Sequence, residues 1–388
     1  MTAFFTGPAI AWGPGAIEQL SGLGARRALL LVDPAVARAP TTRRVVEELG
    51  KAGTVVETVD DVRDLDSVAV VEALRPRAVR FAPDWVVAVG GGRTIDGAKA
   101  VRLALECPAL SFAALPAVLP WPDRPTTLLA AIPTTSGSGA EASGAADLTA
   151  GDGGLLELSD RRLGPEWALV DPAFAASVPP DAVVPFALQA LAQAAEAYLS
   201  AWSNPFSDAL ALDVVATVAR RLPHAVRWSD DPDARAALHY AATAAGLAAS
   251  NAQRGVAHAL ARALTGPTGL GYARLLALAL PAVLEFDRPG ARDRLEQLGA
   301  AAAAPDERVA VPLATRLRRL EETLRCPADL RSAGVPAERL GEVRATVVER
   351  TLRSPAVLAN PRVPSADDVG ALLDAIGGYG AAPRGPAP

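Results

Sequence analysis

One stretch constrains the fold more than any other, DWVVAVGGGRTIDGAKA at residues 84–100. Residues 84–89 form a short apolar run rich in β-branched side chains, three glycines follow at once, and residues 94–105 have the pattern of a helix. A strand, a glycine turn and a helix are the layout of a phosphate cradle. Glycine lets the backbone approach a diphosphate, and the free N–H groups at a helix start suit anions. Three glycines alone could also form only a tight turn.

Strand and helix patterns alternate around this stretch. The predicted strands cover 28–32, 54–58, 85–89, 128–132 and 167–170, and the predicted helices cover 45–51, 66–75 and 94–105. This alternation predicts a parallel, doubly wound sheet. Beyond about residue 178 the chain is rich in Ala and Leu with helical spacing, and prolines such as Pro223, Pro267 and Pro281 are expected to separate the helices. We predict an N-terminal Rossmann-like α/β domain over residues 1–178. A C-terminal all-helical domain follows over 179–388, with a disordered tail at about 381–388.

Composition narrows the class of protein. The chain has 388 residues and a net charge of −5, so nothing favours a nucleic-acid partner. Cys107 and Cys326 are too few for a disulfide framework or a cysteine zinc site. The first residues lack a basic signal-peptide region, and apolar stretches such as 275–284 are too short to span a membrane. We therefore expect a cytoplasmic protein without a membrane partner, and its Arg-, Ala- and Pro-rich composition suggests a bacterial source.

A second loop strengthens the cofactor interpretation. The sequence AIPTTSGSGAEAS at 131–143 follows a predicted strand about forty residues after the glycines, and alone it could be an ordinary Ser/Gly loop. Together the two loops resemble those of the iron-containing (group III) alcohol dehydrogenase family, which includes maleylacetate reductases and is related to dehydroquinate synthase. FALQALAQAAEAYLS at 186–200 and AGLAASNAQRGVAHALARAL at 245–264 resemble two of its helices, so the resemblance covers essentially the whole chain. It implies the two-domain fold with an active cleft between the domains, a nicotinamide cofactor and a homodimer.

The resemblance also implies a set of dinucleotide-binding residues. Asp33 follows the first strand, where an acidic side chain can bind ribose hydroxyls and repel a 2′-phosphate, although it could equally be a turn-forming residue before proline. NAD is therefore expected in preference to NADP. Arg93 replaces the usual serine, and it could pair with the diphosphate, block the cradle or point to solvent. The expected cofactor-binding residues are Asp33, Gly90, Gly91, Gly92, Arg93, Asp96, Thr134, Thr135 and Ser138.

The family's metal ligands are largely replaced. Members normally bind iron or zinc through one Asp and three His, and the matching positions here are Gln189, Gln193, His258 and Tyr272. A further family histidine corresponds to Arg262. Amides and a phenol are poor partners for a divalent cation, and an arginine would repel one, so we expect no metal. These five residues are the candidate catalytic set, with Arg262 binding a carboxylate or polarising a carbonyl and His258 or Tyr272 as general acid or base. Alternatively, they are polar residues that only satisfy one another.

The sequence thus predicts a metal-independent NAD(P)-dependent oxidoreductase that acts on a small carbonyl or alcohol. Arg262 would suit an anionic substrate of this class. Two alternatives stay open at this point: a non-redox lyase, cyclase or isomerase on the same scaffold, and a catalytically silent cofactor-binding homologue.

Overall fold

The computed structural model describes residues 4–379 except 117, 152–153, 177, 229–230, 305–306 and 308–310. The tail predicted to be disordered lies outside the described residues. The chain forms two compact units: the first comprises Met1–Pro179 and Asp231–Ser250, and the second Pro180–Asp230 and Asn251–Pro388. The two units are described separately below.

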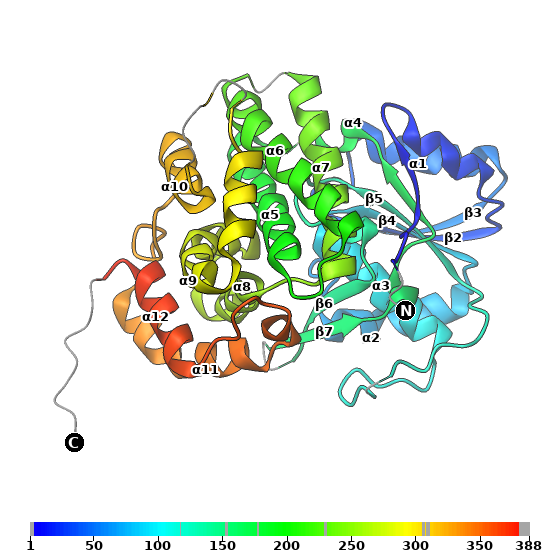
Figure 1. Ribbon diagram of the computed structural model, residues 1–388. Coiled ribbons are helices and arrows are strands. Elements are labelled where there is room, and N and C mark those ends of the chain that lie inside the picture. The colour runs from blue at the N-terminus through cyan, green and yellow to red at the C-terminus, as the bar shows by residue number, and fades with distance from the viewer. Residues whose placement is uncertain are drawn as a thin grey trace. The chain divides into compact units, whose positions relative to one another are not determined.

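The first unit is built on a six-stranded sheet in which every strand pair is parallel. Its order is β1-β8-β5-β4-β2-β3 (Figure 1). The strands are β1 Ala9–Trp12, β2 Arg27–Val32, β3 Val55–Val59, β4 Trp85–Gly90, β5 Leu128–Pro133 and β8 Trp167–Val170. The predicted α/β class is therefore confirmed. The five predicted strands are present, whereas the edge strand β1 was missed because it has only four residues and follows a Gly-Pro pair.

Helices cover both faces of this sheet because successive strand residues point to opposite sides. On one face Leu29 and Leu31 of β2 belong to a core with α2 (Val68–Phe81) and α3 (Gly92–Glu106). On the other face Leu30 and Val32 pack with residues of η1 (Ala16–Gly22), α1 (Pro40–Lys51) and α4 (Pro172–Ala175). Both faces are thus buried, which explains the nearly continuous apolar strands.

A small antiparallel hairpin, β6 (Ala145–Thr149) with β7 (Leu155–Ser159), adds to the first unit and was not predicted. Two short helical turns, η2 (Ala140–Ala142) and η3 (Arg161–Leu163), flank it. The hairpin strands mix charged and apolar residues without a strong alternation, so their sequence gave little strand signal.

Helix α7 (Pro232–Ala252) lies in the range that the sequence assigned to the helical domain, yet residues 231–250 group with the first unit. Two close approaches explain this grouping. A Cβ at Gly246 would lie 2.1 Å from the backbone oxygen of Gly139, so the helix backbone rests directly on the second loop. The Arg235 side chain also donates to the backbone oxygens of Ala175 and Val178, at 3.0 and 2.6 Å.

The second unit is helical (Figure 1). Its described helices are α5 Pro180–Leu199, α6 Pro205–Arg227, α8 Val256–Thr268, α9 Tyr272–Ala301, α10 Leu313–Thr323, α11 Ala337–Arg353, η4 Pro355–Leu358 and α12 Ala366–Gly377. The expectation that Pro223, Pro267 and Pro281 separate helices was wrong, since they lie inside α6, α8 and α9. Each removes only one backbone donor, and packing of the long helices offsets that loss.

One helical segment, Ala182–Leu199 in α5, is long and apolar enough to cross a membrane by length and composition. However, 83% of it is buried inside the protein, as expected for the central helix of a packed unit. Its apolarity therefore reflects burial among the neighbouring helices.

Candidate functional site

The glycine stretch forms the predicted loop at the end of a central strand. β4 ends at Gly90, α3 begins at Gly92, and Gly91 caps the helix without a side-chain hydrogen bond. The second loop runs alongside, because the N–H of Thr134 donates to the Gly90 oxygen at 3.0 Å. A Cβ at Gly92 would lie 2.8 Å from the Ser138 side chain, so the two loops can approach this closely only with glycine at this position.

The loops also lie where ligands bind in open α/β sheets. β3 lies on one side of β2 and β4 on the other, so the chain reverses its direction of winding at β2 and β4. Ligands bind at the carboxyl ends of the strands beside such a reversal. Asp33 follows β2 there, and its N–H donates to the Val89 oxygen at 2.9 Å. Its carboxylate accepts the N–H of Ala35 at 2.9 Å, which is the turn-forming role considered above.

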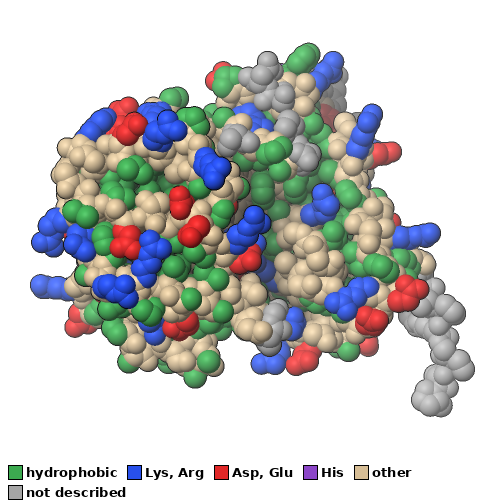
Figure 2. Space-filling model, turned by 180° about the vertical axis from the view of Figure 1, so that it is seen from behind, with side chains coloured by type: hydrophobic (Ala, Val, Ile, Leu, Met, Phe, Trp, Pro, Cys, Tyr) green, Lys and Arg blue, Asp and Glu red, His purple; other side chains and the backbone are tan. Residues whose placement is uncertain are grey.

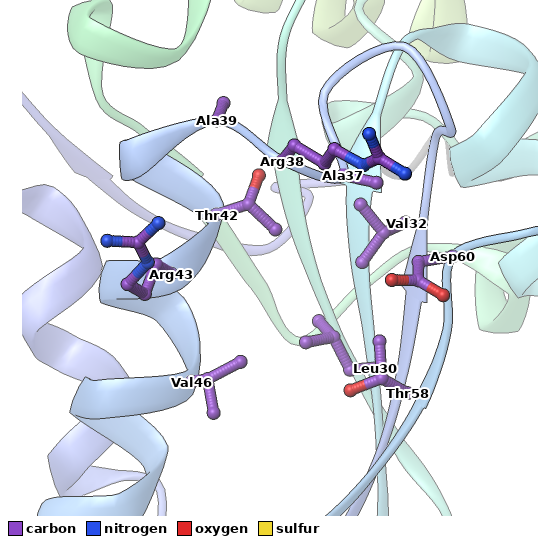
Figure 3. A pocket seen from close by; sticks show the side chains of 10 residues that line it. All are labelled: Leu30, Val32, Ala37, Arg38, Ala39, Thr42, Arg43, Val46, Thr58 and Asp60. Atoms are coloured by element: carbon purple, nitrogen blue, oxygen red, sulfur yellow. The ribbon is translucent and has the colours of Figure 1, made fainter.

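A hollow of about 270 Å³ opens beside the carboxyl ends of β2 and β3. Its floor is apolar, and Arg38, Arg43 and Asp60 supply charge. Figure 3 shows Thr42, Arg43 and Val46 along α1 on one side and Asp60 on the opposite side. A binding space therefore adjoins the loop that carries Asp33.

Arg93 lies at the surface, with 65% of its side chain exposed, and there it pairs with two carboxylates. Its Nε lies 2.9 Å from both carboxylate oxygens of Asp66, and its Nη2 lies 2.7 Å from Asp64 Oδ1. Burial opposes the charge, but Asp66 and then Asp64 outweigh it and raise the pKa of Arg93. The guanidinium is therefore held by the loop between β3 and α2.

Asp96 is likewise engaged with the protein. Its Oδ1 lies 3.4 Å from Lys99 Nζ, and its Oδ2 accepts the N–H of Asp147 at 3.3 Å. Lys99 is fully buried and donates to the Ala145 oxygen at 2.6 Å. Together these two side chains fasten the β6–β7 hairpin to α3.

Sequence reasoning missed one pair of polar residues in the first unit. Ser136 on the second loop and His239 on α7 are 8% and 1% exposed, and Ser136 Oγ lies 3.1 Å from His239 Nδ1. Burial lowers the pKa of His239 to about 4. No signal for this pair existed in the sequence, because the residues are separated by 103 positions and His239 matches no quoted motif.

Three of the five predicted catalytic residues meet in the second unit. His258, on the first turns of α8, is 1% exposed, and its Nδ1 lies 2.6 Å from the hydroxyl of Tyr272 at the start of α9. The two rings meet edge to face with centroids 5.6 Å apart. The guanidinium carbon of Arg262, one turn after His258, lies 4.0 Å above the centre of the Tyr272 ring.

The other two residues lie on a buried face of α5. Gln189 and Gln193 are 6% and 3% exposed, and Glu196 shares their face at the next turn. Glu196 accepts the backbone N–H of His258 at 3.1 Å, so α5 is tied to the start of α8 close to the predicted group. Burial raises the pKa of Glu196 to about 7, although the backbone N–H groups of His258, Gly255 and Ala257 oppose this shift. The sequence used Glu196 only to align a motif, whereas in the structure its carboxylate binds the backbone at the start of α8.

Comparison with known proteins defines the family. Residues 8–172 match the family model described as iron-containing alcohol dehydrogenase, and residues 184–377 match the C-terminal model of the Fe-containing alcohol dehydrogenase family. The chain belongs to the iron-containing alcohol dehydrogenase family. The family named from the sequence motifs is therefore confirmed, and with it an oxidoreductase of the alcohol dehydrogenase type.

Individual relatives are similar in sequence to this chain over most of their length. An alcohol dehydrogenase of Thermococcus barophilus is 34% identical over 330 residues, covering 82% of this chain and 83% of that protein. An NADPH-dependent butanol dehydrogenase of Clostridium saccharobutylicum is 27% identical, covering 95% and 96%. The solved iron-containing alcohol dehydrogenase of Thermococcus thioreducens is 31% identical with a TM-score of 0.88, covering 96% and 98%.

The residues that the sequence predicts at the family's metal positions do not suit a divalent cation. Gln189, Gln193, His258 and Tyr272 offer two neutral amides, one imidazole and one phenol, and that imidazole already contacts the phenol. Iron and zinc require deprotonated ligands, which amides do not provide. Within the described part of the chain, no group of three or more His, Cys, Asp and Glu side chains could hold a metal ion.

Proposed function

We propose that this protein is a metal-independent, NAD(P)-dependent oxidoreductase that interconverts a small carbonyl compound and its alcohol. The observation that carries this proposal is the His258–Tyr272 hydrogen bond of 2.6 Å beneath the Arg262 guanidinium. This contact places a proton donor, the Tyr272 hydroxyl, next to a second titratable group, the His258 ring. Both residues are proposed to occupy positions that hold the metal in the family.

The chain's own residues would move one proton. A substrate carbonyl oxygen placed at the Tyr272 hydroxyl would take its proton when the carbonyl is reduced to the alcohol. His258, already in contact with the phenol oxygen, would return its Nδ1 proton to it, while Nε2 would take up a proton that comes ultimately from water, so that the ring stays neutral. The Arg262 guanidinium above the ring stabilises the phenolate formed between these steps, because a cation there is attracted to the anionic ring.

The glycine loops would hold the dinucleotide, which supplies the hydride when bound. The residues proposed to hold it are Gly90, Gly91, Gly92, Thr134, Thr135 and Ser138, and their packing supports this role because a Cβ at Gly91 or Gly92 would fill the space between the loops. Arg93 and Asp96 would act through the positions of neighbouring loops, given their contacts with Asp66 and Lys99.

NAD is proposed as the preferred cofactor because Asp33 presents a carboxylate at the end of β2, where it can bind ribose hydroxyls. NADP is the alternative cofactor, since Arg38 beside the adjoining hollow carries the positive charge that can bind a 2′-phosphate. The similar butanol dehydrogenase, which is named as NADPH-dependent, makes both cofactors necessary in any assay.

A non-redox enzyme on the same scaffold is the second candidate. The observation in its favour is Arg93, which replaces a small family residue beside the cradle. Its guanidinium forms ion pairs with Asp64 and Asp66. Such an enzyme would retain the pocket chemistry of His258 and Tyr272 without hydride transfer to its substrate.

The other expectations remain part of the proposal. We propose a cytoplasmic homodimer with a small-molecule substrate, without nucleic-acid or membrane partners. The mixed charge supports the absence of a nucleic-acid partner, because Figure 2 shows basic and acidic side chains interspersed over the face in view and the net charge is −5.

Two assays test the proposal. NADH and NADPH are titrated by fluorescence, and their oxidation is followed with a panel of short aldehydes, ketones and 2-oxo acids, including anionic members. Saturable binding together with turnover of at least one carbonyl supports an oxidoreductase. Absence of binding at millimolar concentrations of either cofactor contradicts it, and binding without any exchange of hydride favours the non-redox candidate.

A further inference from the structure

The Ser136–His239 pair joins the second loop of the proposed dinucleotide site to α7. Ser136 lies between Thr135 and Ser138, two residues assigned to the cofactor, and it contacts a histidine. Both members are more than nine-tenths buried, at 8% and 1% exposure.

The contact between Ser136 and His239 leaves one polar hydrogen of the pair without an acceptor. A neutral histidine carries one N–H and serine carries one O–H, whereas the single contact between Oγ and Nδ1 uses only one of these two protons. Among the residues that the structure describes, His239 Nε2 has no hydrogen-bond partner. If the proton is on Nε2, that buried N–H lacks an acceptor. If it is on Nδ1, the Ser136 O–H lacks one. An unsatisfied buried donor is costly, so an acceptor from outside the protein is expected.

In the tautomer with the proton on Nδ1, the Ser136 hydroxyl is the donor without an acceptor, and it can donate to a ligand. Ser136 is the more exposed member and lies on the loop itself, whereas His239 lies on α7 and is 1% exposed. With Nδ1–H donating to Ser136 Oγ, the hydroxyl proton is directed away from the histidine and is available to a ligand at the loop. The low pKa of His239, about 4 through burial, keeps the ring neutral at pH 7.

Helix α7 holds the pair in place. Four residues after His239, Thr243 donates to Oε1 of Glu141 in the second loop at 2.6 Å. Gly246 rests against Gly139 of that loop, which has a φ of +62° and no room for a Cβ. The hydroxyl of Ser136 is therefore fixed before any ligand arrives, which reduces the cost of ordering it on binding.

We propose that Ser136, oriented by His239, donates a hydrogen bond to an oxygen of the bound dinucleotide. Ser136 is then a cofactor-binding residue and His239 a positioning residue. This inference rests on the proposed function, because it assigns a new contact within the same cofactor site. The acceptor class is a phosphate, ribose or carboxamide oxygen.

The test compares cofactor affinity with the stability of the free protein. Ser136→Ala, His239→Phe and the double variant are titrated with NADH, and their melting temperatures are measured without it. Loss of one hydrogen bond predicts about 3- to 10-fold weaker binding for each single variant. The double variant should lose little more, since both changes remove the same donor. His239→Asn, which keeps a donor near Nδ1, should recover part of the affinity. Tyr240→Phe, on the next residue of α7, is the matched control and should bind as wild type.

Four results would overturn the inference. Unchanged NADH affinity in Ser136→Ala, with a lower melting temperature, would make the pair a structural contact satisfied by water. If the losses of NADH affinity in the two single variants added up in the double variant, the two residues would act independently of one another. If Gly91→Val abolishes NADH binding while Ser136→Ala does not weaken it, the inference fails and the proposed function stands. If wild-type protein binds no NADH or NADPH at all, both fail together.

Discussion

Replacing Tyr272 by phenylalanine isolates the proton that the proposed reaction requires. The change removes one oxygen atom, the one that lies 2.6 Å from His258 Nδ1, and keeps the ring under the Arg262 guanidinium. Loss of a general acid lowers turnover by roughly 10²- to 10⁴-fold. At about 1.4 kcal/mol per factor of ten, this raises the barrier by about 3–5 kcal/mol. The effect on folding should be far smaller, about 1 kcal/mol for one partly buried hydrogen bond.

The assay separates catalysis from binding and stability. Turnover of the identified carbonyl substrate is measured with saturating NADH, NADH affinity is measured by fluorescence, and stability is measured by urea unfolding. The matched control is Tyr198→Phe on α5, whose hydroxyl bonds Gln297 within the same unit. The control should keep its turnover, while Tyr272→Phe should lose it and keep its NADH affinity.

One result would refute the reasoning. If Tyr272→Phe retained turnover within about threefold of wild type, far below the loss expected for a general acid, the phenol would not supply the proton. His258→Ala with equally full turnover would then show that the group of His258, Tyr272 and Arg262 is a structural remnant of the metal site.

Three further predictions follow from the same contacts. Gly91→Val should weaken NADH binding at least tenfold by fluorescence titration, because a Cβ alone would already lie 3.2 Å from the Thr135 side chain and a larger group would displace the loop; unchanged affinity would contradict this. Arg262→Ala should raise KM for anionic substrates more than for neutral ones, and equal changes for both would remove its proposed role as a carboxylate partner. Burial raises the pKa values of Glu196 and Asp287 to about 7, so their contribution to stability is lost as pH rises through 7. Urea unfolding should therefore show lower stability at pH 8 than at pH 6.5, with a smaller difference in Glu196→Gln, and the opposite trend would contradict the burial argument.

The sequence predicted the parts of the fold that depend on local pattern. The β4–glycine–α3 stretch formed as expected, and the two glycine loops meet because β4 and β5 pair in register from Trp85 to Gly90. Short or irregular elements were missed, such as β1 and the β6–β7 hairpin. The prediction of helix ends from proline was wrong, because α6, α8 and α9 continue through Pro223, Pro267 and Pro281.

The candidate site was only partly predictable because side-chain partners are set by tertiary packing. Spacing along α8 placed His258 and Arg262 on one face, but their shared contact with Tyr272 appears only once α9 folds back. Arg93 could not be assigned from its neighbours in sequence, since Asp64 and Asp66 come from another loop. The Ser136–His239 pair depends on α7 joining the first unit, which helical periodicity does not reveal.

The most direct test of the central claim measures hydride transfer and metal content in the same sample. The iron and zinc of the purified protein are quantified by mass spectrometry, and part of the sample is then treated with a strong chelator. In both portions, reduction of the substrate by NADH deuterated at both C4 positions is followed by product analysis. The account predicts far less than one metal ion per chain and full transfer of deuterium to the carbonyl carbon. About one iron or zinc per chain, with activity lost on chelation and restored by that metal, would contradict it.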